Sequence, residues 1–209
     1  MSLDTLGARH LSTYDYPYPT SPEFTKFARR GTLFERAISH YPSTTASHMT
    51  LFTGRFPIAH DVRSFFSSLA PDVPTLPVLL RRAGYMTAAS TEDANVLRTM
   101  GFERGFHVYW ESHAAPGAPG IQRAVRWLRW RPPEPFFLFV HTYEVHSPYT
   151  PRPQDLALVR PRETVRSDDY AARHDGEIRY LDWIVGNLLE QLNGQGLLGR
   201  TIVVITSDH

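Results

Sequence analysis

The stretch PFFLFVHTY, residues 135–143, is a continuous apolar run rich in aromatic residues. It is too short for a typical helix, and such runs are typical of strands that are buried on both faces of a parallel sheet. The last residues of the chain, TIVVITSDH (201–209), form a second such run, which is β-branched and ends in a carboxylate and an imidazole. We therefore predict two core strands here.

Helical and strand patterns alternate along the rest of the chain. Proline and glycine residues mark the expected ends of these elements. We predict helices at 22–30, 75–82, 121–130 and 168–192, strands at 32–37 and 85–89, and a loop at 114–120. This alternation favours an α/β fold with a mainly parallel sheet sandwiched by helices.

The composition narrows the class of protein. The chain has 209 residues, of which 42% are hydrophobic and 21% are charged, as in ordinary globular proteins. A net charge of only +1 argues against a nucleic-acid partner. The absence of cysteine excludes disulfides and thiolate chemistry. The sequence has no apolar run of about 18 residues, so we predict no membrane span in this stretch.

Polar residues stand where predicted strands end, which is where open parallel sheets bind ligands. Asp4 follows a short apolar start, Asp208 and His209 close the last strand, and His141 and His146 lie at or just beyond the end of the aromatic strand. Taken singly, a strand-end aspartate is most often a helix cap and a lone histidine a structural residue.

The stretch YPSTTASHMTLFTGRFP, residues 41–57, adds a dense group of hydroxyls. Thr44 lies just ahead of a predicted helix that runs through Leu51, so its hydroxyl either caps that helix or occupies its electropositive end. Two carboxylates, an imidazole and this hydroxyl suit one divalent cation.

Several short motifs follow one another along the chain: Asp4-Thr5-Leu6, Tyr14-Asp15-Tyr16, Thr20-Ser21-Pro22, 28–34, Thr53-Gly54-Arg55, 83–88, 101–106, 136–149 and Ser207-Asp208-His209. In their order and spacing the chain resembles the N-terminal half of the catalytic domain of the sulfatase family, within the alkaline phosphatase superfamily. Departures are Ala46 for the signature proline, Gly7 for a common arginine, Asp61 for a usual glycine, and no recognisable lysine-histidine motif at 89–100.

The resemblance implies an alkaline-phosphatase-like fold, truncated at both ends. Residues 1–209 would be the N-terminal part of a single sulfatase-like catalytic domain, with the C-terminal part absent. Because a signal or anchor upstream stays possible, the localisation is left unknown, as is the oligomeric state.

The resemblance also implies roles for individual residues. Asp4, Thr44, Asp208 and His209 would ligate one divalent metal ion, with manganese or zinc favoured by the imidazole over calcium or magnesium. Thr44 would be the nucleophile, and His146 would contact the substrate and protonate the leaving oxygen. For His48 two interpretations remain: it supports Thr44 and binds substrate in place of an arginine, or it only fixes the helix start. We interpret His141 as structural.

The threonine at position 44 affects which reaction we expect. Sulfatases of this family use a cysteine or serine that is oxidised to formylglycine, a path that Thr44 cannot follow. We therefore expect a hydrolase of sulfate- or phosphate-type esters with phosphorus esters (phosphodiester or phosphonate) preferred, acting on a small-molecule, glycan or lipid ester. The alternatives are a phosphoethanolamine- or phosphoglycerol-type transferase and, in a different class, an inactive sulfatase-like binding module. The stretch by itself could lack activity, because its terminal strands are incomplete.

Overall fold

The computed structural model describes residues 1–65, 67–92, 95–113, 117–160 and 169–209. The chain divides into two units, each of which is discontinuous in sequence. The first unit consists of residues 1–4, 38–143 and 204–209, and the second of residues 5–37 and 144–203.

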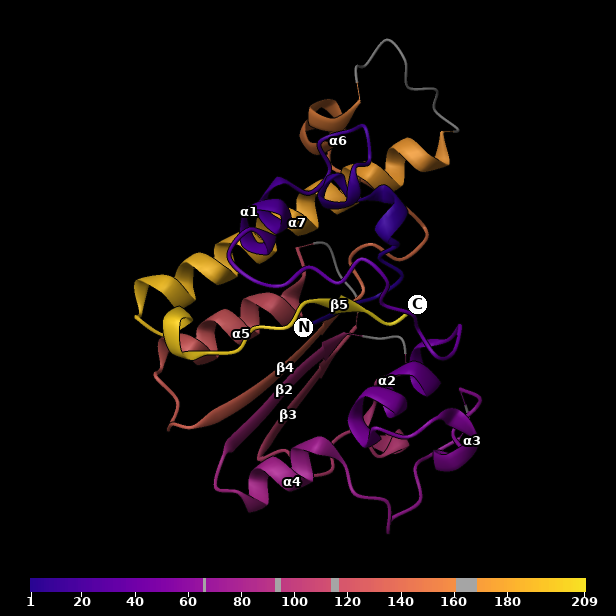
Figure 1. Cartoon of the computed structure of the whole chain (residues 1–209), viewed down its shortest axis with the longest axis vertical. Coiled ribbons are helices and arrows are strands. Elements are labelled where there is room, and N and C mark those ends of the chain that lie inside the picture. Colours follow the sequence, from indigo (N-terminus) through magenta and orange to yellow (C-terminus); the bar gives the residue numbers. More distant parts are fainter. Residues whose placement is uncertain (66, 93–94, 114–116, 161–168) are drawn as a thin grey trace. The chain divides into compact units, whose positions relative to one another are not determined.

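A parallel sheet forms the centre of the first unit (Figure 1). Its five strands lie in the order β3-β2-β4-β1-β5, and each pairing is parallel. The strands are β1 (Ser2–Leu3), β2 (Met86–Glu92), β3 (Val108–Ser112), β4 (Phe136–Thr142) and β5 (Thr206–Ser207). The predicted parallel α/β architecture is thus confirmed, with the aromatic strand at its centre.

Helices of the first unit cover both faces of β4. The ring of Phe136 contacts Trp127 of α5 (Pro119–Arg129), whereas the ring of Phe139 contacts Phe52 of α2 (Thr44–Thr53). Side chains alternate between faces along a strand, so positions 136 and 139 point to opposite sides. Helix α5 therefore packs on one face of the sheet and α2 on the other.

The core of the first unit lies on the α2 face. Met49 and Phe52 of α2 pack there with Phe102, Tyr109 and Phe139. The remaining helices of this unit are α3 (Pro57–His60), α4 (Leu76–Arg82) and the 3-10 turn η3 (Arg98–Met100). This packing anchors α2 against β4, and so fixes the start of α2 near the carboxyl ends of the strands.

Helices dominate the second unit. They are η1 (Ala8–His10), η2 (Ser12–Tyr14), α1 (Pro22–Ala28), α6 (Pro153–Val159), α7 (Tyr170–Gly194) and η5 (Leu198–Arg200). Asp182 of α7 accepts the backbone N–H groups of Glu23 (2.9 Å) and Phe24 (2.8 Å), which open α1. Among the described residues no helix has the length and hydropathy that crossing a membrane requires.

Some predicted elements differ from the structure. The strand predicted at 32–37 is wrong: these residues are exposed and unpaired in any sheet, so their apolar side chains gain nothing from strand formation. The last strand is limited to Thr206–Ser207, because its neighbour β1 offers only two residues for pairing. Helix α5 begins at Pro119, within the predicted loop 114–120, of which residues 114–116 lie outside the described residues. Strand β3 was not predicted.

Candidate active site

Asp4 and Asp208 lie at the carboxyl edge of the sheet, immediately after β1 and β5. These strands are neighbours, and their register pairs Leu3 with Ser207, so the two aspartates follow at the same level. Both side chains are fully buried. Two remote carboxylates are therefore brought together inside the first unit, as strand ends of a parallel sheet require.

The imidazole of His209 faces three oxygen groups. Its Nε2 lies 3.3 Å from Thr44 Oγ1, 3.6 Å from Asp208 Oδ2 and 3.9 Å from Asp4 Oδ1. The four residues that the sequence predicts as metal ligands thus converge on one point in the first unit. Of these, Asp4, Asp208 and His209 present ligand atoms within 4.8 Å of one another.

The spacing and chemistry of these groups fit a divalent cation. Donor atoms about 2.0–2.2 Å from a tetrahedral cation lie about 3.3–3.6 Å apart, close to the separations around His209. Within the described part of the chain, neither carboxylate oxygen of Asp4 has a hydrogen-bond partner. A buried carboxylate without hydrogen bonds is costly, and a bound cation would remove that cost.

Helix α2 delivers Thr44 to this point. Ser43 is the extended residue before the helix, and Thr44 is its first helical residue, so the prediction that Thr44 lies just ahead of the helix is wrong by one position. The helix ends at Thr53 and is followed by Gly54, whose φ of 64° is left-handed. Of the two alternatives for Thr44, the structure thus favours the second: Thr44 lies in the first turn, at the electropositive end of the helix, where anions are stabilised.

Two serine hydroxyls hold the backbone carbonyl of Asp208, which precedes His209. Ser47 Oγ donates to the Asp208 carbonyl oxygen at 2.7 Å, and Ser39 Oγ donates to the same oxygen at 2.5 Å. The backbone N–H of His209 donates to Asp208 Oδ1 at 3.0 Å. Ser39 and Ser47 therefore support the backbone of the Asp208–His209 pair.

His48 is buried one helical turn after Thr44. Its Nδ1 donates to the Thr44 carbonyl oxygen at 2.8 Å, and Ser2 Oγ donates to its Nε2 at 2.8 Å. Burial, followed by the nearby His141, lowers the pKa of His48 to about 3, so the ring is neutral. Both ring nitrogens are occupied inside the first unit, which suits a supporting role for His48; its contact with substrate stays a prediction.

Ser2, to which the sequence assigned no role, and His141, which was interpreted as structural, also lie beside these residues. They are directly paired across β1 and β4, and His141 Nε2 lies 3.6 Å from Asp4 Oδ2. A step of two residues back from Asp4 leads to Ser2 on the same face of the strand. This alternation along β1 was the signal that could have identified Ser2. It becomes informative only when the pairing of β1 with β4 is known.

His146, the predicted proton donor, belongs to the second unit. Its Nδ1 donates to the Ser147 carbonyl oxygen at 2.7 Å. Its role toward a leaving group stays a prediction.

A second cluster, in the second unit, consists of His10, His174 and Asp175. The carboxylate of Asp175 is already used: Oδ1 contacts His10 at 2.8 Å, and Oδ2 accepts from Tyr16 at 2.9 Å and from Arg160 at 2.7 Å. A guanidinium on the same oxygen opposes a second cation. This cluster is therefore a buried polar network rather than a metal centre.

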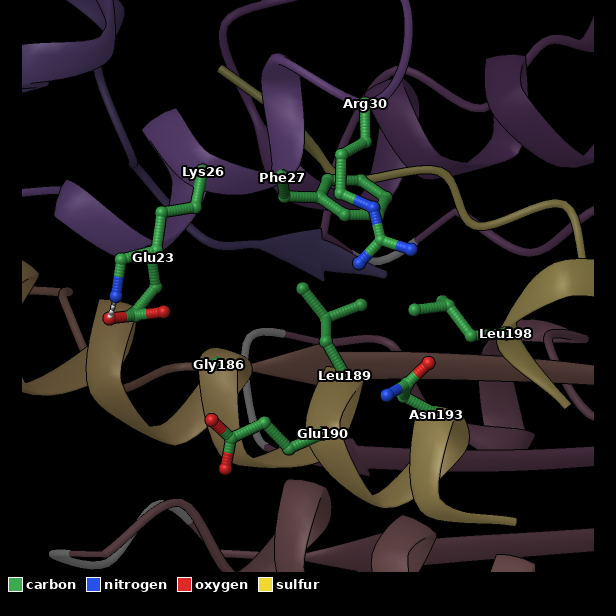
Figure 2. Close-up of a pocket in the computed structure, with 9 residues that line it drawn as sticks. All are labelled: Glu23, Lys26, Phe27, Arg30, Gly186, Leu189, Glu190, Asn193 and Leu198. Carbon is green, nitrogen blue, oxygen red and sulfur yellow. Dashed lines mark hydrogen bonds and ion pairs between the residues drawn. The ribbon is translucent and has the colours of Figure 1, made fainter. Parts of the chain in front are cut away.

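The second unit also has a cavity of about 210 Å³ between α1 and α7 (Figure 2). Its walls mix the charged residues Lys26, Arg30 and Glu190 with the apolar Phe27 and Leu189. The described residues that line it include no grouping of nucleophile, base and metal ligands.

Fold and site together define an α/β protein of the alkaline-phosphatase-like class, with a candidate one-cation centre at the carboxyl edge of its sheet. The chain belongs to the sulfatase family, whose family model matches residues 2–209.

One curated relative of the chain is described as a transferase. The chain is 23% identical over 213 residues to a protein described as "Putative transferase YhbX" from Escherichia coli K12. The match covers 99% of this chain and 36% of the relative. The chain therefore spans about a third of the length of that relative.

Solved structures share the fold at low identity. BT4656 in complex with its substrate D-glucosamine-2-N,6-O-disulfate has a TM-score of 0.78 at 15% identity, covering 100% of this chain and 64% of its own. The phosphonate monoester hydrolase of Agrobacterium radiobacter has a TM-score of 0.77 at 17% identity, covering 100% and 61%. The periplasmic domain of EcEptC from Escherichia coli, in complex with Zn, has a TM-score of 0.69 at 16% identity, covering 93% and 58%.

Proposed function

We propose that the protein is a metal-dependent hydrolase of sulfate- or phosphate-type esters, with Thr44 as the nucleophile and phosphorus esters (phosphodiester or phosphonate) as preferred substrates. The observation that carries this proposal is the 3.3 Å approach of Thr44 Oγ1 to His209 Nε2, beside two buried carboxylates. A hydroxyl held among cation ligands at the start of a helix is placed to attack an anionic ester.

Each residue of the site has its own role in the proposed displacement at the ester. Asp4, Thr44, Asp208 and His209 would hold a divalent cation, which lowers the pKa of the hydroxyl and neutralises charge on the ester. Zinc or manganese suits the imidazole in this set, and the neighbour solved with Zn is consistent with that choice. His48 and Ser2 orient the first turn of α2, and thereby the Thr44 side chain.

The bond changes are balanced in two steps. Thr44 Oγ bonds to phosphorus as its proton leaves to solvent, and the bond from phosphorus to the leaving oxygen breaks with its electron pair. That oxygen takes a proton, for which His146 is our candidate donor. Water then attacks the phosphothreonine in line, and Thr44 Oγ departs and regains a proton.

Threonine supports the preference for phosphorus. Its β-carbon carries a methyl group, so oxidation would give a ketone and not the aldehyde of formylglycine. A threonine sulfate would lack the route by which a formylglycine hydrate expels sulfate. A phosphothreonine, in contrast, is open to a second in-line displacement.

A transferase is the second candidate, because the relative YhbX is described as a putative transferase and its match covers 99% of this chain. In that case the phosphoethanolamine or phosphoglycerol group is held on Thr44 after the first step, and an acceptor alcohol replaces water in the second step and receives that group. Adding such alcohols to the assay separates the two reactions, since a transferase yields the new ester and a hydrolase yields the free acid.

The direct test measures turnover of aryl sulfate, phosphate monoester, phosphodiester and phosphonate substrates by the wild type, Thr44→Ala and Thr44→Ser. We expect phosphodiester or phosphonate turnover by the wild type, loss of it by at least about 1,000-fold in Thr44→Ala, and partial retention in Thr44→Ser. Unchanged turnover in Thr44→Ala would remove Thr44 as nucleophile. Aryl sulfate cleavage well above that of every phosphorus ester would overturn the substrate preference, and wild type without turnover on any ester would favour the inactive binding module.

A further inference from the structure

We propose that His141 is a positioning residue of the metal centre, which holds Oδ2 of Asp4 so that Oδ1 of the same carboxylate faces the cation. This inference rests on the proposed function, because it assigns a role toward the cation that Asp4 would bind.

The sheet places His141 on the correct face. Ser2 pairs with His141 across β1 and β4, and Asp4 lies two residues after Ser2, so these three side chains share one face. It is the face covered by α2, since the His48 and His141 rings meet edge-on with centroids 5.0 Å apart. His141 therefore lies beside the ligands, one strand away from Asp4.

The two oxygens of Asp4 face different partners. Oδ2 lies 3.6 Å from His141 Nε2, while Oδ1 lies 3.9 Å from His209 Nε2. One oxygen thus points to the proposed ligand set, and the other points to an imidazole outside it. A carboxylate that binds a cation through one oxygen is commonly held by a hydrogen bond to the other, which fixes its orientation.

The burial of His141 calls for such a partner. Its side chain is fully buried, and in the part of the chain that the structure describes neither of its ring nitrogens has a hydrogen-bond partner. A buried imidazole without partners loses the hydrogen bonds it makes in water. An apolar residue would fill this place at lower cost, so the imidazole beside Asp4 indicates an interaction with that carboxylate.

A second metal centre built on His141 is not favoured. His48, His141 and Asp208 do present ligand atoms to one another. The two nitrogens of His48, however, are already bound to Thr44 and Ser2. His141 consequently acts on the one centre through Asp4.

The test compares zinc binding to apo-protein in wild type, His141→Leu and His141→Gln, measured by calorimetry. Leucine removes the donor, and we expect zinc affinity to fall by about 10- to 100-fold. Glutamine places an amide N–H near the former Nε2, and we expect affinity within about 3-fold of wild type. The visible spectrum of the Co²⁺-substituted protein should change in His141→Leu and be restored in His141→Gln, which a packing role would not produce.

His60→Gln is the matched control, because His60 is a buried histidine of the same unit that hydrogen-bonds Thr50 and Val62. It should bind zinc as wild type does. If His141→Leu does not fold, His141→Asn replaces it, since its shorter amide stops short of Asp4 and should weaken binding likewise.

Two negative outcomes are distinct. Wild type that binds zinc together with an equally tight His141→Leu or His141→Asn variant would overturn the role of His141 and leave the proposed function standing. Wild type that binds neither zinc nor manganese would overturn both.

Discussion

Thr44 Oγ1 lies 3.3 Å from Nε2 of His209, although 165 positions separate the two residues in the chain. Two features of the first unit produce this approach. The pairing of β1 with β5 brings the Asp208–His209 pair beside Asp4, and α2 begins at Thr44 while packing on β4 through Phe52. The proposed reaction depends on this one contact being kept by the fold.

Removal of the cation is predicted to destabilise the protein. Asp4 and Asp208 are both fully buried and have ligand atoms within 4.8 Å of each other, so a positive charge between them relieves their mutual repulsion. A chelator should lower the unfolding temperature and zinc or manganese should restore it, with a gain of about 2.7 kcal/mol when free metal is 100 times its dissociation constant. Differential scanning calorimetry measures this response.

Asp4→Asn should abolish that response, because the amide is a weaker ligand than the carboxylate. Asp155→Asn is the control, since Asp155 is also buried but pairs with Arg152 in the second unit. A wild-type unfolding temperature that ignores both chelator and metal would contradict the prediction.

How far the sequence predicts this site depends on the residue. Asp4, Asp208 and His209 were predictable, because strand ends of a parallel sheet collect polar groups and their motifs could be read directly. The place of Ser2 and His141 beside Asp4 was not, because it follows from the pairing of β1 with β4, and a sequence does not specify register.

Some elements of the fold were likewise predictable from the sequence, and others were not. Phe136–Thr142 was predictable as a buried strand from its continuous apolar run. The prediction of a strand at 32–37 was wrong because apolar side chains indicate a strand only when other residues cover them. Phe34 stays 69% exposed. Strand β3 was not predicted because its charged and polar residues interrupt the apolar run. Its pairing with β2 stabilises the strand instead.

His48 is predicted to position Thr44 through the backbone. His48→Leu removes the Nδ1 donor to the Thr44 carbonyl, and displacement of the nucleophile should lower kcat by about 100-fold with little change in KM. His48→Asn keeps a donor near the Nδ1 position and should retain most of the activity. Steady-state kinetics with the preferred ester measures both constants.

The same experiment decides between the two interpretations of His48. A residue that binds substrate would raise KM when replaced, and His48→Asn would then be as impaired as His48→Leu. Ser2→Ala leaves Nε2 of His48 without its donor and should cost about 1–3 kcal/mol of unfolding free energy.

Asp182 is predicted to stabilise the second unit by capping α1. Its carboxylate accepts the N–H groups of both Glu23 and Phe24, which have no partners inside that helix. Asp182→Ala should lower the unfolding free energy by about 2–3 kcal/mol, and Asp182→Asn by less, because one acceptor oxygen remains. Urea denaturation followed by circular dichroism gives these values.

Lys26→Ala is the control for this prediction. Lys26 forms an exposed ion pair with Glu23 on the same helix, and such pairs contribute at most about 1 kcal/mol. A loss in Lys26→Ala as large as that in Asp182→Ala would show that α1 is sensitive to any change and not to its cap.

Glu177 is predicted to make stability fall as the pH rises. Burial raises its pKa to about 7, and the Glu144 carboxylate adds to the rise, against the opposing Thr150 N–H bond. Between the ordinary value of 4.5 and about 7, the folded protein holds a proton that the unfolded chain has released. In that window the unfolding free energy therefore decreases with rising pH, by about 3 kcal/mol in all, and it levels off above it.

Glu177→Gln should remove this term, because glutamine does not titrate. The unfolding free energy of Glu177→Gln minus that of wild type should rise by about 3 kcal/mol between pH 4.5 and pH 8, whatever its constant offset. Urea denaturation at half-unit intervals of pH gives this difference. Glu190→Gln removes a charge from an exposed position of the same helix, and so measures the effect of net charge alone. A difference for Glu177→Gln that is independent of pH, or that matches Glu190→Gln, would show that Glu177 is ionised in the folded protein throughout this range.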